Sequence, residues 1–158
     1  MDPDLLDRYF PFLFGFALLW VVGLNLASIA YRRAQGRPII LRTPPGAAFV
    51  ETAVFGHSNR TWYTKLRGAR RCLVVAVDSG RLIIHPQFPF NLMFMGEMYG
   101  VEHDVGVDVV TQVEWDRTGK TNRIDLRFRG SGGSSEHLTL YLREPGAFVR
   151  ALASNGWR

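Results

Sequence analysis

The stretch Arg71–Pro86, RCLVVAVDSGRLIIHP, decides the fold of this chain. Two runs of apolar residues flank the three small or polar residues Asp78, Ser79 and Gly80. Apolar runs of strand length on either side of such a turn predict a β-hairpin. The sequence therefore predicts a sheet in this region, and the flanking segments show whether the pattern continues.

Strand patterns occur on both sides of this hairpin. They cover residues 48–56, residues 99–116 in two pieces broken near Gly106, residues 122–130 and residues 136–143. In residues 122–130 the apolar and charged side chains alternate, as they do along a strand with one buried face. The final segment, residues 144–157, instead has the spacing of a short amphipathic helix that ends at Asn155 and Gly156. The order is thus about seven strands followed by one helix.

The segment Tyr9–Tyr31 contains no charged residue over 23 positions. As a helix it spans roughly 34 Å, enough to cross a hydrocarbon core of about 30 Å. Its two terminal tyrosines suit the water interface, and Pro11 is expected in the first helical turn. A cleaved signal peptide is the alternative, but the apolar run is too long and the preceding region is acidic. We therefore predict a transmembrane helix.

The charges that flank this helix predict its orientation. The N-terminal tail carries Asp2, Asp4 and Asp7, whereas Arg32, Arg33, Arg37 and Arg42 follow the span. Positively charged flanks remain on the cytoplasmic side. The chain is therefore predicted to cross a bacterial inner (plasma) membrane once, with its N-terminus outside and its C-terminal domain in the cytoplasm.

Four regions follow from these patterns. They are a short tail (1–8), a transmembrane helix (9–31), a basic linker rich in Pro and Gly (32–46) and a β domain (47–158). The prolines favour an extended, semi-stiff linker of modest reach, so the β domain is expected to stay close to the bilayer.

Gly23, Asn25 and Ala27 form a candidate helix-pairing face within the span. Small residues four apart let two membrane helices approach closely, and an amide in hydrocarbon needs a hydrogen-bonding partner. The alternative is that Gly and Ala are simply common in membrane helices. Both interpretations stay open.

The segments VGVDVVTQVEWD (residues 105–116), GKTNRIDLRFRG (119–130) and LTLYLREPGAFVRAL (138–152) resemble the bacterial pleckstrin-homology-like (PH-like) domains. The resemblance covers roughly Ala47 to Ser154. It implies a mainly β fold, in which a bent antiparallel sheet or partial barrel of about seven strands is capped by a C-terminal helix. The long insertion rich in Phe and Met after Pro86 departs from a minimal version of this pattern.

No catalytic, cofactor-binding or metal-binding motif is present in the sequence. Cys72 is the only cysteine, and the four histidines lack the spacing of metal ligands. They are expected to be partly exposed residues at strand ends. Glu102 and Asp104 would lie on the strand face opposite His103, which excludes a triad. The sequence therefore predicts no enzyme and no cofactor. The positive excess behind the net charge of +5 is confined to one region of the chain, so a nucleic-acid-binding surface is not required and no nucleic-acid partner is expected.

A basic cluster between residues 60 and 71 is the first candidate binding site. It contains Arg60, Trp62, Lys65, Arg67, Arg70 and Arg71. The resemblance implies that basic residues in this first inter-strand loop bind the phosphates of anionic lipid headgroups. A polybasic loop near an anionic leaflet gains about 1 kcal/mol of binding free energy for each basic residue close to the surface. The alternative is a solvated basic face that pairs with Glu97, Glu102 and Asp104.

A segment of large apolar residues is the second candidate. Its members are Phe88, Phe90, Leu92, Met93, Phe94, Met95 and Met98. It could cover the sheet of its own domain, dip into the bilayer, or dock on another protein, for which adaptable Met and rigid Phe are suited. We interpret it as a covering flap whose outer side is a protein-contact surface.

Two functions remain in view. The first is a non-catalytic, membrane-anchored interaction module, an accessory or scaffold subunit of an inner-membrane complex that contacts another integral membrane protein. The alternative is a membrane-tethered PH-like domain that binds anionic lipid headgroups through the basic loop.

Overall fold

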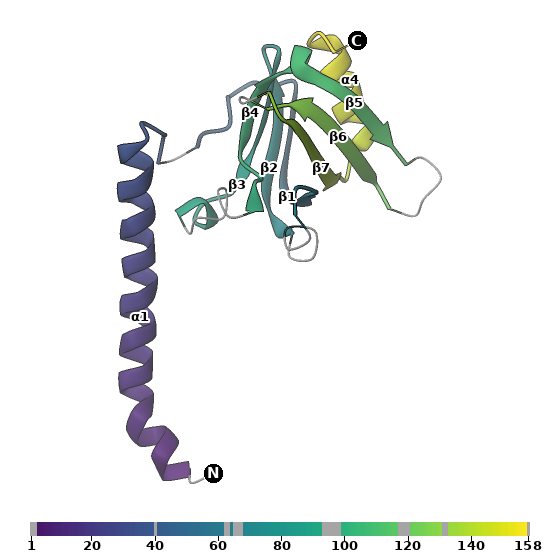
Figure 1. Cartoon of the computed structure of the whole chain (residues 1–158). Helices are drawn as coiled ribbons and strands as arrows, with labels where there is room; N and C mark the ends of the chain where they lie inside the picture. Colours follow the sequence, from purple (N-terminus) through teal and green to yellow (C-terminus); the bar gives the residue numbers. More distant parts are fainter. Residues whose placement is uncertain are drawn as a thin grey trace. The chain divides into compact units, whose positions relative to one another are not determined.

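The computed structural model describes residues 3–39, 41–61, 64, 68–92, 99–116, 121–130 and 133–157, with the backbone alone for residues 3–7. The chain divides into two compact units, Met1–Ile39 and Ile40–Arg158. Helix α1 belongs to the first unit, and the sheet with the C-terminal helix belongs to the second (Figure 1).

Helix α1 (Pro3–Ala34) contains one stretch, Arg8–Ala34, that is long and apolar enough to cross a membrane. The helix begins before the apolar stretch, so Pro11 lies in its interior and not in its first turn as predicted. A proline inside a helix removes one backbone hydrogen bond and clashes with the preceding turn. The helix accordingly has a bend near its N-terminal end (Figure 1).

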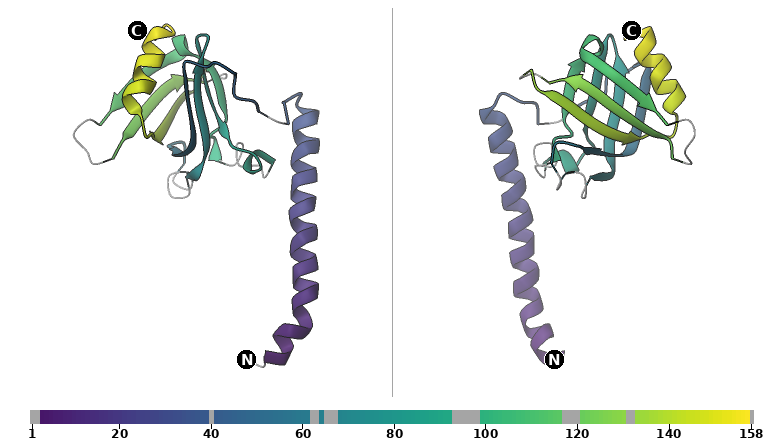
Figure 2. Two further views of the ribbon diagram at one scale, coloured as in Figure 1. Left: turned by 180° about the vertical axis from the view of Figure 1, so that it is seen from behind. Right: turned by 45° about the vertical axis from the view of Figure 1, so that its right-hand side comes forward.

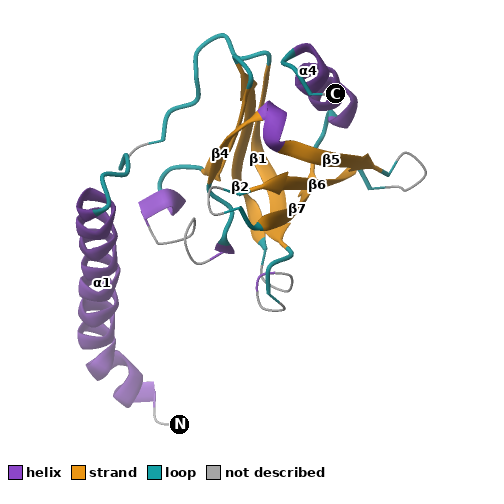
Figure 3. Cartoon of the chain, turned by 45° about the horizontal axis from the view of Figure 1, so that its top comes forward, coloured by secondary structure: helices purple, strands orange, loops and turns teal. Residues whose placement is uncertain are grey.

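The second unit is one antiparallel sheet of seven strands in the order β4-β3-β2-β1-β7-β6-β5. The strands are β1 (Phe49–Ser58), β2 (Ala69–Asp78), β3 (Arg81–Pro86), β4 (His103–Gly106), β5 (Val110–Trp115), β6 (Arg123–Arg129) and β7 (Ser135–Tyr141). Strands β1 to β4 cross the direction of β5 to β7, so the sheet is strongly bent (Figure 3). Its two edge strands are joined by the short helix η2 (Val107–Val109), at the predicted break after Gly106.

The hairpin predicted from residues 71–86 is confirmed as β2 and β3. Asp78 pairs with Arg81, and the two residues between them have positive φ, 48° at Ser79 and 75° at Gly80. Positive φ at both central residues matches the right-handed twist of the two strands. The turn is also tied to the C-terminal end of the chain, because the Gly80 N–H donates to Oδ1 of Asn155 at 3.1 Å.

Helix α4 (Pro145–Ser154) lies across one end of the sheet (Figure 2). Its Phe148 is fully buried and packs edge-on against Phe49 of β1, with ring centroids 5.4 Å apart. The apolar inner faces of all the longer strands join the same core. The predicted fold class, a mainly β chain with an N-terminal apolar helix and a C-terminal capping helix, is therefore confirmed.

His103 is the partly exposed first residue of β4, and its ring lies inside the bend of the sheet. Its ring packs edge-on against Phe128 of β6 at 4.8 Å, and its Nε2 lies 2.8 Å from the carbonyl oxygen of Gly100. His85 is buried, with 4% of its surface exposed. The expectation of a partly exposed histidine is therefore wrong at His85, whereas His103 is partly exposed at the start of β4 as expected.

Burial lowers the pKa of His103 below its ordinary value of 6.5, although the Gly100 hydrogen bond and the charges of Glu136 and Glu102 oppose the shift. As the pH falls below about 6.5, this side chain therefore binds a proton in the unfolded chain, whereas in the folded domain it binds one only at lower pH. Stability due to neutral His103 is present above that pH and decreases as the pH falls toward the pKa of the folded state.

We predict that acidification from about pH 7.5 to 5.5 lowers the free energy of unfolding more in the wild type than in His103→Gln. Urea unfolding of the full-length protein in detergent, followed by tryptophan fluorescence at both pH values, measures this difference. An identical pH dependence in the two proteins would contradict it.

Candidate functional site

Strands β1 and β2 change register between the pairs Val54–Leu73 and Gly56–Ala69. Within this interval a single residue of β1, Phe55, faces three consecutive residues of β2. Such a bulge bends the strand and re-aims its side chains. The bulge lies at the start of β2 and includes Arg70 and Arg71, the last two residues of the predicted basic cluster.

The bulge places two consecutive arginines on the solvent side of the sheet. Neighbouring residues of a regular strand point to opposite faces, but Arg70 and Arg71 are both exposed. Arg71 has φ of 51°, in the left-handed region that side chains other than glycine seldom adopt. The unusual backbone conformation of Arg71 is therefore part of what brings the two guanidinium groups to the same surface.

Arg70, Arg71 and Phe55 line a hollow of about 370 Å³ with a mostly apolar surface. In the described part of the chain, no acidic side chain pairs with either arginine. The hollow therefore combines two positive charges at its wall with an aromatic ring.

An aromatic row continues from this hollow across the outer face of the sheet. The Phe55 ring lies 5.0 Å from the Tyr141 ring of β7, and His57 lies 6.1 Å from Phe55 and 6.5 Å from Tyr141. In the next strand, Arg123 of β6 is the register partner of Tyr141. The Phe55 side of the hollow is thus supported by a neighbouring ring.

A polar cluster around Asp125 lies beside this row. Its carboxylate accepts hydrogen bonds from Oγ1 of Thr139 at 2.6 Å and from Arg123 at 2.8 Å, and it lies 3.5 Å from His137. Burial alone would raise the pKa of Asp125, but these hydrogen bonds and the charges of Arg123 and His137 lower it overall. Asp125 therefore stays ionised and neutralises Arg123, in contrast to the two arginines of the hollow.

The structure places three of the predicted basic residues. Arg60, Arg70 and Arg71 are exposed, and only the last two line the hollow. Trp62, Lys65 and Arg67 lie outside the described residues, as does Glu97 among the proposed acidic partners. Asp104 pairs instead with Arg81 at 2.7 Å. Two of the three described basic residues, Arg70 and Arg71, therefore belong to β2, whereas Arg60 lies between β1 and β2.

Phe88 and Phe90 are strongly exposed, with 62% and 42% of their surface accessible. They lie on a hydrogen-bonded turn in which the Gln87 N–H donates to the Cys72 carbonyl at 2.6 Å. The same turn buries Asn91 and partly buries Leu92. Met93, Phe94, Met95 and Met98 lie outside the described residues. The described part of the segment thus presents two aromatic rings on an anchored backbone.

The surface of α1 is open at the predicted pairing face. A Cβ atom added at Gly23 would meet no atom of the described residues within 4 Å, and Ala27 is exposed. The side-chain amide of Asn25 donates to the carbonyl of Val21 at 2.7 Å, so its NH₂ group is already partnered within the helix.

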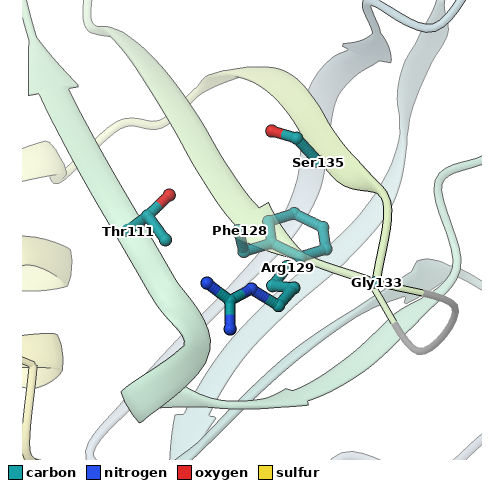
Figure 4. Close-up of a pocket in the computed structure, with 5 residues that line it drawn as sticks. All are labelled: Thr111, Phe128, Arg129, Gly133 and Ser135. Atoms are coloured by element: carbon teal, nitrogen blue, oxygen red, sulfur yellow. The ribbon is translucent and has the colours of Figure 1, made fainter.

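A second, smaller hollow of about 140 Å³ lies among β5, β6 and the turn before β7. Thr111, Phe128, Arg129, Gly133 and Ser135 line it, and the Arg129 guanidinium extends toward Thr111 (Figure 4). Within the described residues, no group of three His, Cys, Asp or Glu side chains could hold a metal ion.

Phe55, His57 and Tyr141 are site residues that the sequence pattern did not predict. Their outward positions follow from strand alternation, but their proximity depends on which strands pair. The signal that could have found them is an aromatic residue on the polar face of a predicted strand.

The chain is thus a mainly β domain, with a cationic and aromatic hollow on its outer face, that follows an apolar helix. No protein-family model matches the sequence, and no curated protein matches it. Thirteen chains of solved structures match. One is described as the Vps36 N-terminal PH domain; it is 18% identical, with a TM-score of 0.43, over 75% of this chain and 86% of that chain.

We predict that Arg71→Gly raises the free energy of unfolding by about 1 kcal/mol, because glycine adopts positive φ without the steric cost that arginine carries. Arg70→Gly is the matched control, and it is expected to give no gain. Urea unfolding of both variants in detergent tests the difference, and a loss of stability in Arg71→Gly would contradict the strained conformation.

Proposed function

We propose that this chain is a non-catalytic, membrane-anchored interaction module, an accessory or scaffold subunit of an inner-membrane protein complex. The observation that carries the proposal is the exposure of Phe88 and Phe90, 62% and 42%, on a turn held by backbone hydrogen bonds. Two exposed aromatic rings on one hydrogen-bonded turn are the kind of surface that contacts another molecule.

The turn offers a partner substantial binding energy at a low entropic cost. Complete burial of a Phe side chain contributes about 1.5–3 kcal/mol relative to exposure. The Asn91 N–H donates to the Gln87 carbonyl at 3.3 Å and the Leu92 N–H to the Pro89 carbonyl at 3.0 Å. Because the backbone is already ordered, docking costs less conformational entropy than ordering a flexible loop would.

The apolar stretch Arg8–Ala34 supports the membrane part of the proposal. Residues 35–48 connect α1 to β1 and reach at most about 50 Å when fully extended. A helix in the bilayer would therefore keep the sheet domain near the membrane surface, where a partner that is itself an integral membrane protein lies within reach. Gly23, Asn25 and Ala27 are the proposed helix contact with that partner.

The anchor is tested on the full-length protein with a C-terminal tag. We expect it to stay with the membrane after alkaline extraction, at its uncleaved size, and the sheet domain to be digested by protease only after spheroplasts are opened. The Arg32 and Arg33 pair at the C-terminal end of α1 is the reason for this orientation. Digestion in intact spheroplasts would contradict it.

The contact surface is tested with the double variant Phe88→Ser/Phe90→Ser in the native membrane. We expect co-purification of a stoichiometric membrane protein to fall at least about tenfold, which corresponds to the loss of about 1.4 kcal/mol. The matched control is Val50→Ser, since Val50 is 45% exposed on β1, away from this turn. Equal co-purification with wild type, or an equal loss in the control, would contradict the assignment.

A further inference from the structure

We propose that the hollow lined by Phe55, Arg70 and Arg71 binds an acidic peptide segment in which a carboxylate side chain neighbours an aromatic or large apolar one. This inference goes beyond the Phe88–Phe90 contact and rests on the proposed function only in assuming a protein partner. It assigns a second surface to the module and names the chemistry of what binds there.

Charge is the first argument. In the described residues, Arg81 pairs with Asp104 at 2.7 Å and Arg123 with Asp125 at 2.8 Å. Arg70 and Arg71 have no such partner there, yet they lie side by side on one surface. The planar guanidinium group matches a carboxylate in a two-bond, bidentate geometry. Two adjacent guanidinium groups are therefore suited to one or two carboxylates.

The apolar lining of the hollow is the second argument. Its Phe55 wall is backed by Tyr141, with ring centroids 5.0 Å apart. An aromatic or aliphatic side chain gains by burial against such a wall, whereas the polar oxygens of a sugar-phosphate headgroup would lose hydrogen bonds there. The volume of about 370 Å³ lies within the range of ligand pockets, and it suits a few side chains.

The shape of the surface favours a peptide over a bilayer. Groups that insert into a bilayer interface must reach about 5–10 Å below the headgroups. Phe55 and Tyr141 are only partly exposed, so most of each ring is already covered and little of it is available for insertion. The positive φ of Arg71, 51°, is the kind of retained strain that clusters at binding sites.

The test uses full-length protein in nanodiscs of phosphatidylcholine, labelled for NMR. The probes are three blocked peptides with Glu-Phe-Asp, Asp-Trp-Glu or Glu-Leu-Asp cores, together with their Gln and Asn counterparts. We expect at least one acidic peptide to shift the signals of Arg70, Arg71 and Phe55. Its uncharged counterpart should give no shift at the same concentration.

Three variants assign the binding to the hollow. Arg71→Gly and Arg70→Gln should each lower the affinity for the acidic peptide at least about tenfold. Arg129→Gln is the matched control, because Arg129 is an exposed arginine of the other hollow, and it should leave the affinity unchanged. Since glycine accepts the backbone conformation at residue 71, Arg71→Gly is expected to stay folded, and its urea unfolding curve checks that lost binding does not come from unfolding.

Glycerophosphoserine and inositol phosphate, which represent lipid headgroups, are titrated in parallel. Shifts of the same signals by these compounds, with none by the acidic peptides, would overturn the proposal in favour of a lipid site. The absence of any shift would also overturn it, as would an equal loss in Arg129→Gln. Because co-purification through Phe88 and Phe90 is measured separately, these results leave the proposed function to its own test.

Discussion

The pairing of β1 with strands on both of its sides is the constraint on which the rest of the domain depends. β1 joins β2 along one edge and β7 along the other, and β7 comes much later in the chain. Gly56 suits this close approach, because a Cβ atom there would lie 2.7 Å from the side chain of Leu140 and 2.9 Å from that of Leu73, so both would have to shift. β1 also positions α4, since the carboxylate of Glu51 accepts the Arg143 N–H at 2.7 Å.

The bulge in the β1–β2 pairing explains which side chains gather on the outer face of the sheet. Where three residues of β2 face Phe55, the alternation of the strand is interrupted and Arg70 and Arg71 come to the same side. The β1–β7 pairing then sets Tyr141 beside Phe55. Sheet geometry thus assembles a cationic and aromatic surface from residues that are distant in sequence, while Asp125 neutralises the neighbouring Arg123.

Local chemistry made much of the fold predictable. The turn residues Asp78, Ser79 and Gly80 and their apolar flanks predicted the β2–β3 hairpin, and the break near Gly106 separates β4 from β5 as expected. The contact of the His103 ring with Phe128 could not be predicted, because it depends on the bend that brings β4 against β6. Strand alternation assumes regular pairing, so it could not reveal the bulge that sets Arg71 beside Arg70. Hydropathy likewise could not predict that α1 begins before the apolar run, and for this reason Pro11 lies in the helix interior.

The most direct test measures which side chains surround Arg70 and Arg71. Side-chain NOE measurements on selectively labelled full-length protein in nanodiscs report which protons lie near the Phe55 ring. We expect contacts from the side chains of both arginines to that ring, because the two residues line one hollow with Phe55. Contacts from Arg70 alone, with Arg71 directed to the opposite face, would mean a regular strand and would contradict it.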